Sequence, residues 1–293
     1  MRDKTMLAAV FEGEGRLSVK EVPVPAIREP DEVLLRVDAA SICGTDVHIL
    51  EVPPGHPATP GAILGHEYTG TVLEMGSDVQ GLEIGDRVVV DPNLTCGKCR
   101  YCRSGMPNMC QSMTTLGIFI NGGFARYNVA PANALHKISE DVPPDVAALA
   151  EPLSCVVNGT QKVRVQPGES VAVLGAGPIG LLFTQVFAAA GAGRIVVSKI
   201  TKVRAEAAAR SGAHVVLDPR EPGFVQRALD ETGGGADVVV DAVGTQLPTA
   251  LDLVRRGGKV LLFGMNQQAA PPVRQNTITR CEISVLGTYI AKY

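Results

Sequence analysis

The sequence is poor in several features that would point to particular classes of protein. It contains no tryptophan, and aromatic residues make up only 4% of its 293 residues, so an aromatic binding face is not expected. No apolar run approaches the about 20 residues that a membrane-spanning helix needs. The first short apolar stretch is broken by Glu12 and Glu14, so we expect no secretory signal, no membrane contact and a cytoplasmic protein.

An excess of charge of one sign is also missing. The net charge of −3 arises from 27 basic and 30 acidic residues and gives no general reason to bind nucleic acid. The 45% of apolar residues and 19% of charged residues are typical of globular proteins and exclude a disordered or fibrous chain. The length allows two domains of about 100–200 residues each.

The pattern of apolar segments changes near residue 167. Before it, strand-like runs at residues 33–37, 68–73 and 88–90 are separated by loops. After it, helical stretches at residues 178–190 and 202–210 alternate with almost continuously apolar strands, at residues 171–174, 195–198, 214–217, 237–241, 259–263 and 283–286. We therefore predict an α/β protein, with an irregular strand-rich domain (residues 1–152) and a doubly wound domain with a six-stranded parallel sheet (residues 153–293).

A G-x-G-x-x-G motif follows the first strand of the second domain. Its glycines, Gly175, Gly177 and Gly180, stand where a strand ends and a helix begins with Pro178 and Ile179. In that context they let a diphosphate approach the backbone at the helix N-terminus. An ordinary strand–helix turn is the alternative.

The strand that follows the glycine motif carries a clue to the cofactor. NAD-binding forms have an acidic residue about 20 residues beyond the motif, which binds the 2′-hydroxyl of the ribose. This sequence has Ser198 and Lys199 there, with Arg204 beyond, and a hydroxyl followed by cations suits a 2′-phosphate. We therefore favour NADP over NAD, unless Lys199 merely begins a solvated helix. Val243 and Gly244 complete the predicted cofactor site.

Four of the seven cysteines crowd into fifteen residues: Cys96, Cys99, Cys102 and Cys110. Four thiolates from one loop suit a closed, tetrahedral structural zinc site. Disulfides are the alternative, which a cytosolic composition disfavours. A nucleic-acid-binding zinc finger is disfavoured because no second basic cluster accompanies the thiols. Without an open coordination position, this lobe (near residues 91–112) would stabilise the loop and not perform catalysis.

A second set of metal-ligand types is dispersed along the first domain. A catalytic zinc takes three protein ligands and leaves one position for water or substrate. Cys43, His66 and either Glu67 or Glu151 can supply that set. Each of these residues taken singly would equally suit a buried cysteine, a core histidine or a surface acid.

Several motifs together resemble the zinc-dependent medium-chain dehydrogenases/reductases, which include alcohol, sorbitol-like polyol and threonine dehydrogenases. Besides the cysteine lobe and the glycine motif, the matching strings are Cys43-Gly44-Thr45-Asp46-x-His48, Gly65-His66-Glu67-x-x-Gly70-x-Val72, Gly85-Asp86-Arg87-Val88 and Gly122-Gly123-Phe124-Ala125. The matches extend from about residue 33 to residue 287. The resemblance implies a GroES-like catalytic domain followed by a Rossmann domain.

The resemblance also assigns ligands to the catalytic zinc. It implies that Cys43 and His66 bind the metal and that Glu67 is the third ligand, as in polyol dehydrogenases. Glu151 stands where the alcohol dehydrogenase branch has a cysteine and the polyol branch has a glutamate that reaches the metal through water. That glutamate favours a polyol or sugar alcohol as the substrate.

The implied activity is hydride transfer between a secondary alcohol or polyol and a nicotinamide cofactor, with zinc as the Lewis acid. Thr45 would hydrogen-bond the substrate hydroxyl, and His48 would pass its proton outward. The alternatives are a threonine-type amino-acid dehydrogenase and a catalytically silent protein that keeps the fold. The intact set of site residues argues against the silent protein.

The resemblance finally implies a homodimer or homotetramer in which the strand at residues 283–287 pairs across subunits. Members of the family run to about 350 residues. We therefore expect that a native tail of roughly 50 residues, which would return to the catalytic domain, is absent from this sequence.

Overall fold

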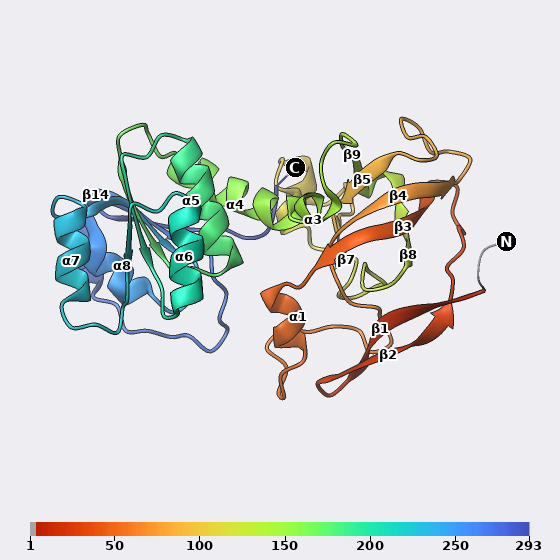
Figure 1. Ribbon diagram of the computed structural model, residues 1–293, viewed down its shortest axis with the longest axis horizontal. Helices are drawn as coiled ribbons and strands as arrows, with labels where there is room; N and C mark the ends of the chain where they lie inside the picture. The colour runs from red at the N-terminus through yellow and green to blue at the C-terminus, as the bar shows by residue number, and fades with distance from the viewer. Residues whose placement is uncertain (1–3, 293) are drawn as a thin grey trace. The chain divides into compact units, whose positions relative to one another are not determined.

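The protein folds into two compact units, seen in the computed structural model, which describes residues 4–292 (Figure 1). The first unit extends to Pro152 and also takes in Lys292, and the second is Leu153–Ala291. Within residues 4–292, no helix combines the length and the apolar character needed to cross a membrane.

A five-stranded antiparallel sheet forms the centre of the first unit. In spatial order its strands are β8 (Tyr127–Pro131), β3 (Glu32–Ser41), β4 (Glu67–Met75), β5 (Arg87–Val90) and β9 (Leu135–Lys137). Val33, Leu34 and Leu35 are all fully buried because both faces of the sheet are covered. Leu34 packs with residues of β1, whereas Val33 and Leu35 face a second core. The strand-rich domain is confirmed.

Short elements complete the first unit. The hairpin of β1 (Thr5–Gly13) and β2 (Arg16–Pro23) covers one face of the sheet. The cysteine lobe contains β6 (Asn93–Leu94), α2 (Arg100–Arg103), η1 (Pro107–Met109) and β7 (Thr114–Thr115). The remaining helices are α1 (Gly44–Ile49), η2 (Ala132–Ala134) and α3 (Pro144–Ala147). Except for the loop containing the cysteines, the sequence analysis placed none of these elements.

The second unit is built on a parallel sheet whose six strands follow the usual order of a doubly wound fold. The order is β12 (Val215–Leu217), β11 (Arg194–Ser198), β10 (Ser170–Leu174), β13 (Ala236–Asp241), β14 (Val254–Leu262) and β15 (Ser284–Gly287). All neighbouring strands are parallel. This confirms the predicted Rossmann domain.

Helices cover both faces of this sheet, as Figure 1 shows. In β10, Val171 and Val173 point to one face and Ala172 and Leu174 to the other, so both sides of the strand are apolar. The first face is covered by α4 (Ala150–Val163), α5 (Pro178–Ala189) and α6 (Lys202–Arg210). The second is covered by α7 (Phe224–Glu231), α8 (Leu247–Leu253) and α9 (Gln275–Arg280). The glycine motif lies between the end of β10 and the start of α5.

Candidate catalytic and cofactor-binding sites

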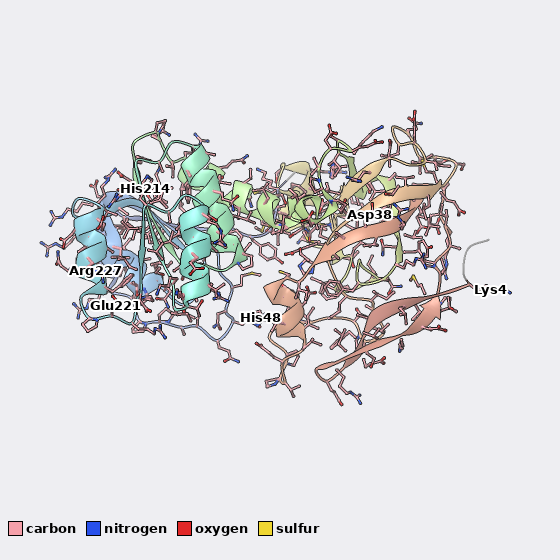
Figure 2. The ribbon with its side chains drawn as sticks, viewed as in Figure 1. Lys4, Asp38, His48, His214, Glu221 and Arg227 are labelled. Carbon is pink, nitrogen blue, oxygen red and sulfur yellow. The ribbon has the colours of Figure 1, made fainter. Side chains whose placement is uncertain are left out.

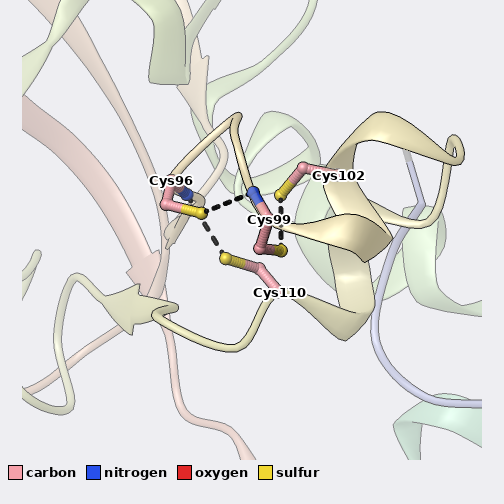
Figure 3. A group of neighbouring side chains, drawn as sticks. All are labelled: Cys96, Cys99, Cys102 and Cys110. Atoms are coloured by element: carbon pink, nitrogen blue, oxygen red, sulfur yellow. Dashed lines mark hydrogen bonds between the residues drawn. The ribbon is translucent and has the colours of Figure 1, made fainter.

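Four thiols from the cysteine lobe point toward a common centre (Figure 3). The sulfur atoms of Cys96, Cys99, Cys102 and Cys110 all lie within 4.8 Å of one another. A disulfide would hold two sulfurs about 2.05 Å apart, whereas all seven cysteines here are free thiols. Four sulfurs at about 2.3 Å from a zinc ion would be spaced by about 3.8 Å. The geometry therefore fits a closed tetrahedral metal site.

Backbone amides of the lobe prepare it for a cation. The N–H of Cys96 donates to Sγ of Cys110 at 3.3 Å, and the N–H of Cys99 donates to Sγ of Cys96 at 3.4 Å. The N–H groups of Cys102 and Gln111 lower the pKa of Cys99 to about 6. Burial raises the pKa of Cys102 to about 11. A metal bound here would release the proton of Cys102, because metal ligands must be thiolates.

The second group of possible metal ligands brings together two segments of the first unit. Cys43 precedes α1, while His66 and Glu67 stand at the start of β4. One ligand atom from each of the three lies within 4.8 Å of the other two. His66 and Glu67 are buried and Cys43 is partly exposed. A thiolate, an imidazole and a carboxylate with one accessible side match the donor set of a catalytic zinc site.

Glycines fix the segment that carries two of these ligands. Gly65 has a φ of +90°, and a Cβ atom there would collide with the ring of Phe124. A Cβ atom at Gly117 or Gly122 would collide with the carbonyl oxygen of Gly65. Three chain segments therefore pack backbone to backbone next to His66. Side chains at these positions would separate the segments and move the ligand.

The buried carboxylate of Asp46 touches two of the three candidate ligands. Its Oδ2 accepts the N–H of Cys43 at 2.8 Å, and its Oδ1 lies 3.6 Å from Nδ1 of His66. Within residues 4–292, neither Oδ1 of Asp46 nor Nδ1 of His66 has a hydrogen-bond partner, although both atoms are buried. The contact leaves Nε2 of His66 for a metal, as in carboxylate–histidine–zinc arrangements.

The same region is electrostatically suited to a cation. Burial lowers the pKa of His66, but Asp46 and Cys43 outweigh this effect and raise the pKa to about 11. The buried carboxylate of Asp46 and the thiol of Cys43 thus favour a positive charge beside His66. Ser41 also donates a hydrogen bond from Oγ to Oε2 of Glu67, which leaves the other carboxylate oxygen free to coordinate.

The remaining predicted catalytic residues lie on helices. Thr45 and His48 are on α1, next to Cys43 in sequence, and Figure 2 labels His48. Nδ1 of His48 lies 2.9 Å from Oε1 of Glu51. Glu151 is buried in the first turn of α4, but in the described part of the chain it does not join the group of three gathered ligands. The structure thus groups Glu67, rather than Glu151, with Cys43.

The three glycines of the predicted dinucleotide loop have three different surroundings. Gly175 has a φ of +104°, which favours glycine. A Cβ atom at Gly180 would collide with the carbonyl oxygen of Gly175, so the first turn of α5 packs directly on the loop. A Cβ atom at Gly177 would meet nothing within 4 Å. Gly177, which precedes Pro178 and Ile179, therefore leaves open space where a diphosphate can approach the backbone.

A charged cluster lies at the ends of β11 and β12. Oγ of Ser198 is buried and accepts the N–H of Gly175 at 3.1 Å, so this residue braces the glycine loop. Nζ of Lys199 lies 3.3 Å from Oδ2 of Asp218. Arg220 donates to the same carboxylate from Nε at 3.0 Å and from Nη2 at 2.7 Å. These contacts hold the pKa of Asp218 well below its usual range. Arg204 lies exposed on α6.

Another buried carboxylate shapes the turn after β13. Asp241 accepts the N–H of Val243 at 2.9 Å and the N–H of Gly244 at 2.7 Å with Oδ1, and the N–H of Gln246 at 2.8 Å with Oδ2. Gly244 has a φ of +92°, and a Cβ atom there would press on Gly264. The predicted cofactor residues Val243 and Gly244 are therefore held rigidly at the carboxyl end of a strand, where α/β sheets bind ligands.

Five functional candidates escaped the sequence analysis: Ser41, Asp46, Asp218, Arg220 and Asp241. A signal existed for Asp46, which is three residues after Cys43, and for Asp241, which ends an apolar strand. For Ser41 and Asp218, the spacing in the sequence does not reveal the partners, because their contacts with Glu67 and Lys199 join different strands. Arg220 lies two residues after Asp218, and its role follows only once Asp218 is placed beside Lys199.

Two protein families match most of the chain. Residues 29–140 match the alcohol dehydrogenase GroES-like domain, which covers the candidate metal ligands of the first unit except Glu151. Residues 178–292 match the zinc-binding dehydrogenase family.

Individual proteins agree with this result. The L-threonine 3-dehydrogenase of Pyrococcus horikoshii is 40% identical over 84% of this chain and 71% of its own length. The D-altritol 5-dehydrogenase of Agrobacterium fabrum is 38% identical over 97% of this chain and 84% of its own length. A structure described as a zinc-binding dehydrogenase from Sinorhizobium meliloti 1021 bound to NADP has a TM-score of 0.94 and 34% identity, and the match covers 99% of this chain and 86% of that one. The chain therefore belongs to the zinc-dependent medium-chain dehydrogenases/reductases, oxidoreductases that act on CH–OH groups.

Proposed function

We propose that this protein oxidises a secondary hydroxyl group of a polyol, and reduces the corresponding ketone, with NADP as the hydride acceptor and donor. The observation that carries the proposal is the grouping of Cys43, His66 and Glu67, whose ligand atoms lie within 4.8 Å of one another. These three residues would hold a zinc ion with an open position, and Glu151 would act on it through water. The four-cysteine lobe would hold a second, structural zinc.

A zinc ion bound by Cys43, His66 and Glu67 would supply Lewis-acid polarisation of the substrate oxygen. Residues of the chain would then bind and transfer the proton of the substrate hydroxyl. Thr45 would hydrogen-bond the substrate hydroxyl, and His48 would carry the proton outward. Asp46 would orient the ring of His66, and Ser41 would orient the carboxylate of Glu67.

The choice of a polyol over an amino acid is supported by the extent of the matches to relatives. The relative named for D-altritol matches 97% of this chain, whereas the relative named for L-threonine matches 84%. The resemblance implies that the glutamate at position 151, in place of a cysteine, favours a polyol over a simple alcohol. We therefore place L-threonine second among the substrates to be tested.

The preference for NADP is supported by charge at the end of β11. Lys199 and Arg220 flank Asp218, so two cations share one anion and the cluster keeps a net positive charge. A carboxylate that would bind the 2′-hydroxyl of NAD is missing from positions 198 and 199. The exposed Arg204 adds a further cation.

The edge position of β15 supports the proposal that subunits pair through this strand.

The test combines metal analysis with a substrate screen. Purified protein should contain about two zinc ions per chain, and polyols should be oxidised faster with NADP than with NAD. Cys43→Ser should lose one of the two zinc ions and activity by about 100-fold or more. Cys281→Ala is the matched control, because that thiol joins neither group of ligands. This variant should keep both zinc ions and full activity. A zinc-free active protein, or a fully active Cys43→Ser variant, would refute the proposal.

A further inference from the structure

We propose that Glu51 is a positioning residue for the proton carrier His48, selecting the imidazole tautomer that can accept the substrate's proton. This inference rests on the proposed function and adds to it a residue outside the motifs that define the family resemblance. The observation behind it is the 2.9 Å contact between Nδ1 of His48 and Oε1 of Glu51.

The contact is built into the end of α1. The N–H of Gly55 donates to the carbonyl oxygen of His48 at 2.9 Å, so the chain turns back over the end of the helix. A Cβ atom at Gly55 would lie 3.3 Å from Cβ of His48 and would collide with the carboxylate of Glu51. The turn thus passes close to both side chains, and a glycine at position 55 leaves room for their contact.

Stability alone does not account for this pair. Both side chains are 49% exposed, and an exposed ion pair between residues three apart adds little to the stability of a protein. Its chemical effect is larger. A carboxylate only accepts hydrogen bonds, so in the neutral imidazole Nδ1 of His48 carries the hydrogen and Nε2 carries the free lone pair. This is the arrangement in which a third group orients a catalytic base.

The neighbouring imidazole of His56 does not compete for the carboxylate. Nδ1 of His56 lies 2.8 Å from the carbonyl oxygen of Pro57, and the ring lies 6.4 Å from that of Phe119. His56 is therefore engaged elsewhere. His48 and Glu51 form a pair that one substitution can separate.

The kinetic experiment uses the zinc-loaded enzyme and its fastest substrate. Glu51→Ala should lower kcat by about tenfold, the smaller end of the effect of removing a partner that orients a functional histidine, and leave KM within about twofold. Glu51→Gln should restore most of kcat, because the amide oxygen can still accept from Nδ1. Glu12→Ala, which removes a partly exposed carboxylate 2.6 Å from Nζ of Lys20, is the control and should have no effect.

The nitrogen spectrum of His48 gives a second readout that does not depend on activity. In protein labelled with ¹⁵N-histidine and assigned with His48→Ala, the native ring should show a protonated Nδ1. The Glu51→Ala ring should show a mixture of tautomers. An unchanged kcat in Glu51→Ala, or a native His48 protonated at Nε2, would overturn the inference.

The double variant separates this inference from the proposed function. If His48→Ala lowers kcat and adding Glu51→Ala lowers it no further, Glu51 acts through His48. Independent losses would contradict that role. A wild-type enzyme that oxidises no alcohol would refute the proposed function, and the tautomer of His48 would still decide the inference.

Discussion

A single carboxylate, that of Asp218, organises the charged end of β11 and β12. Arg220 binds it with two nitrogens and also donates to the carbonyl oxygen of Ile200 at 2.8 Å, so the loop after β11 is tied to β12. Because these contacts hold the pKa of Asp218 well below its usual range, its charge persists even at acidic pH. Lys199 therefore has a fixed counter-charge and a restricted position at the end of β11.

The first prediction concerns this lysine. Lys199→Ala should weaken the binding of NADPH by about 10- to 100-fold, because one charge-assisted hydrogen bond contributes about 1.5–3 kcal/mol. Binding of NADH, which lacks the 2′-phosphate, should change by less than about threefold. Fluorescence titration of both reduced cofactors measures the difference.

The control for this prediction is an arginine on a different surface of the same unit. Arg227→Ala removes an exposed cation that pairs with Glu221 at 2.6 Å (Figure 2). It should leave both affinities unchanged. Equal losses for NADPH and NADH in Lys199→Ala would show that the lysine does not read the 2′-phosphate.

At the scale of elements, two glycines at the junction of β10 and α5 have different roles. One is required for packing, and the other leaves room for a ligand. Gly180 is required by the fold, because a Cβ atom there would collide with Gly175. Gly177 has a φ of −79°, which any residue adopts, and has open space around it. A glycine at that position therefore suits the approach of a ligand to the backbone.

Two alanine variants should therefore behave differently. Gly180→Ala should lower the free energy of unfolding by about 1–3 kcal/mol, the usual cost of overpacking. Gly177→Ala should change it by less than about 0.5 kcal/mol and still weaken cofactor binding by about tenfold, or about 1.4 kcal/mol. Denaturant unfolding and cofactor titration give the two quantities. A destabilised Gly177→Ala variant with unchanged affinity would contradict the assignment.

The elements also show what the sequence alone can predict. The parallel strands were found because strands buried on both faces are almost continuously apolar. The start of β14 was missed by five residues, since Arg255 and Gly257 suggest a turn although Val254 already pairs with Ala236 before a register shift. The helix α7 was not placed, as it follows Gly223 without a capping side chain. The candidate metal ligands were found from motif spacing, whereas the partners of Glu67 and His48 depend on side-chain distances that spacing does not fix.

At the scale of the whole molecule, the two units carry different ligand sites. The candidate metal ligands Cys43, His66 and Glu67 and the cysteine lobe belong to the first unit, and the glycine loop belongs to the second. Each ligand stabilises the state that binds it, by an amount set by its concentration and affinity. Stabilisation by metal and by cofactor should therefore appear in different parts of the chain.

Hydrogen exchange can test this separation. Removal of zinc by a chelator should increase amide exchange in residues 91–112 and around Cys43, and leave β10 to β15 unchanged. NADPH at about 100 times its Kd should slow exchange in the second unit, with up to about 2.7 kcal/mol of added protection. Similar changes throughout the chain on chelation would show that the two units unfold as one.

The segment from residue 43 to residue 51 has a consequence for recombination between relatives. Within nine residues it holds a candidate metal ligand, the carboxylate that braces it, a hydroxyl, and an imidazole with its own carboxylate. The turn at Gly55 closes the segment. Chimeras whose crossover points fall before residue 41 or after residue 55 inherit this machinery intact. A crossover inside the segment would join a proton carrier from one parent to a metal ligand from the other.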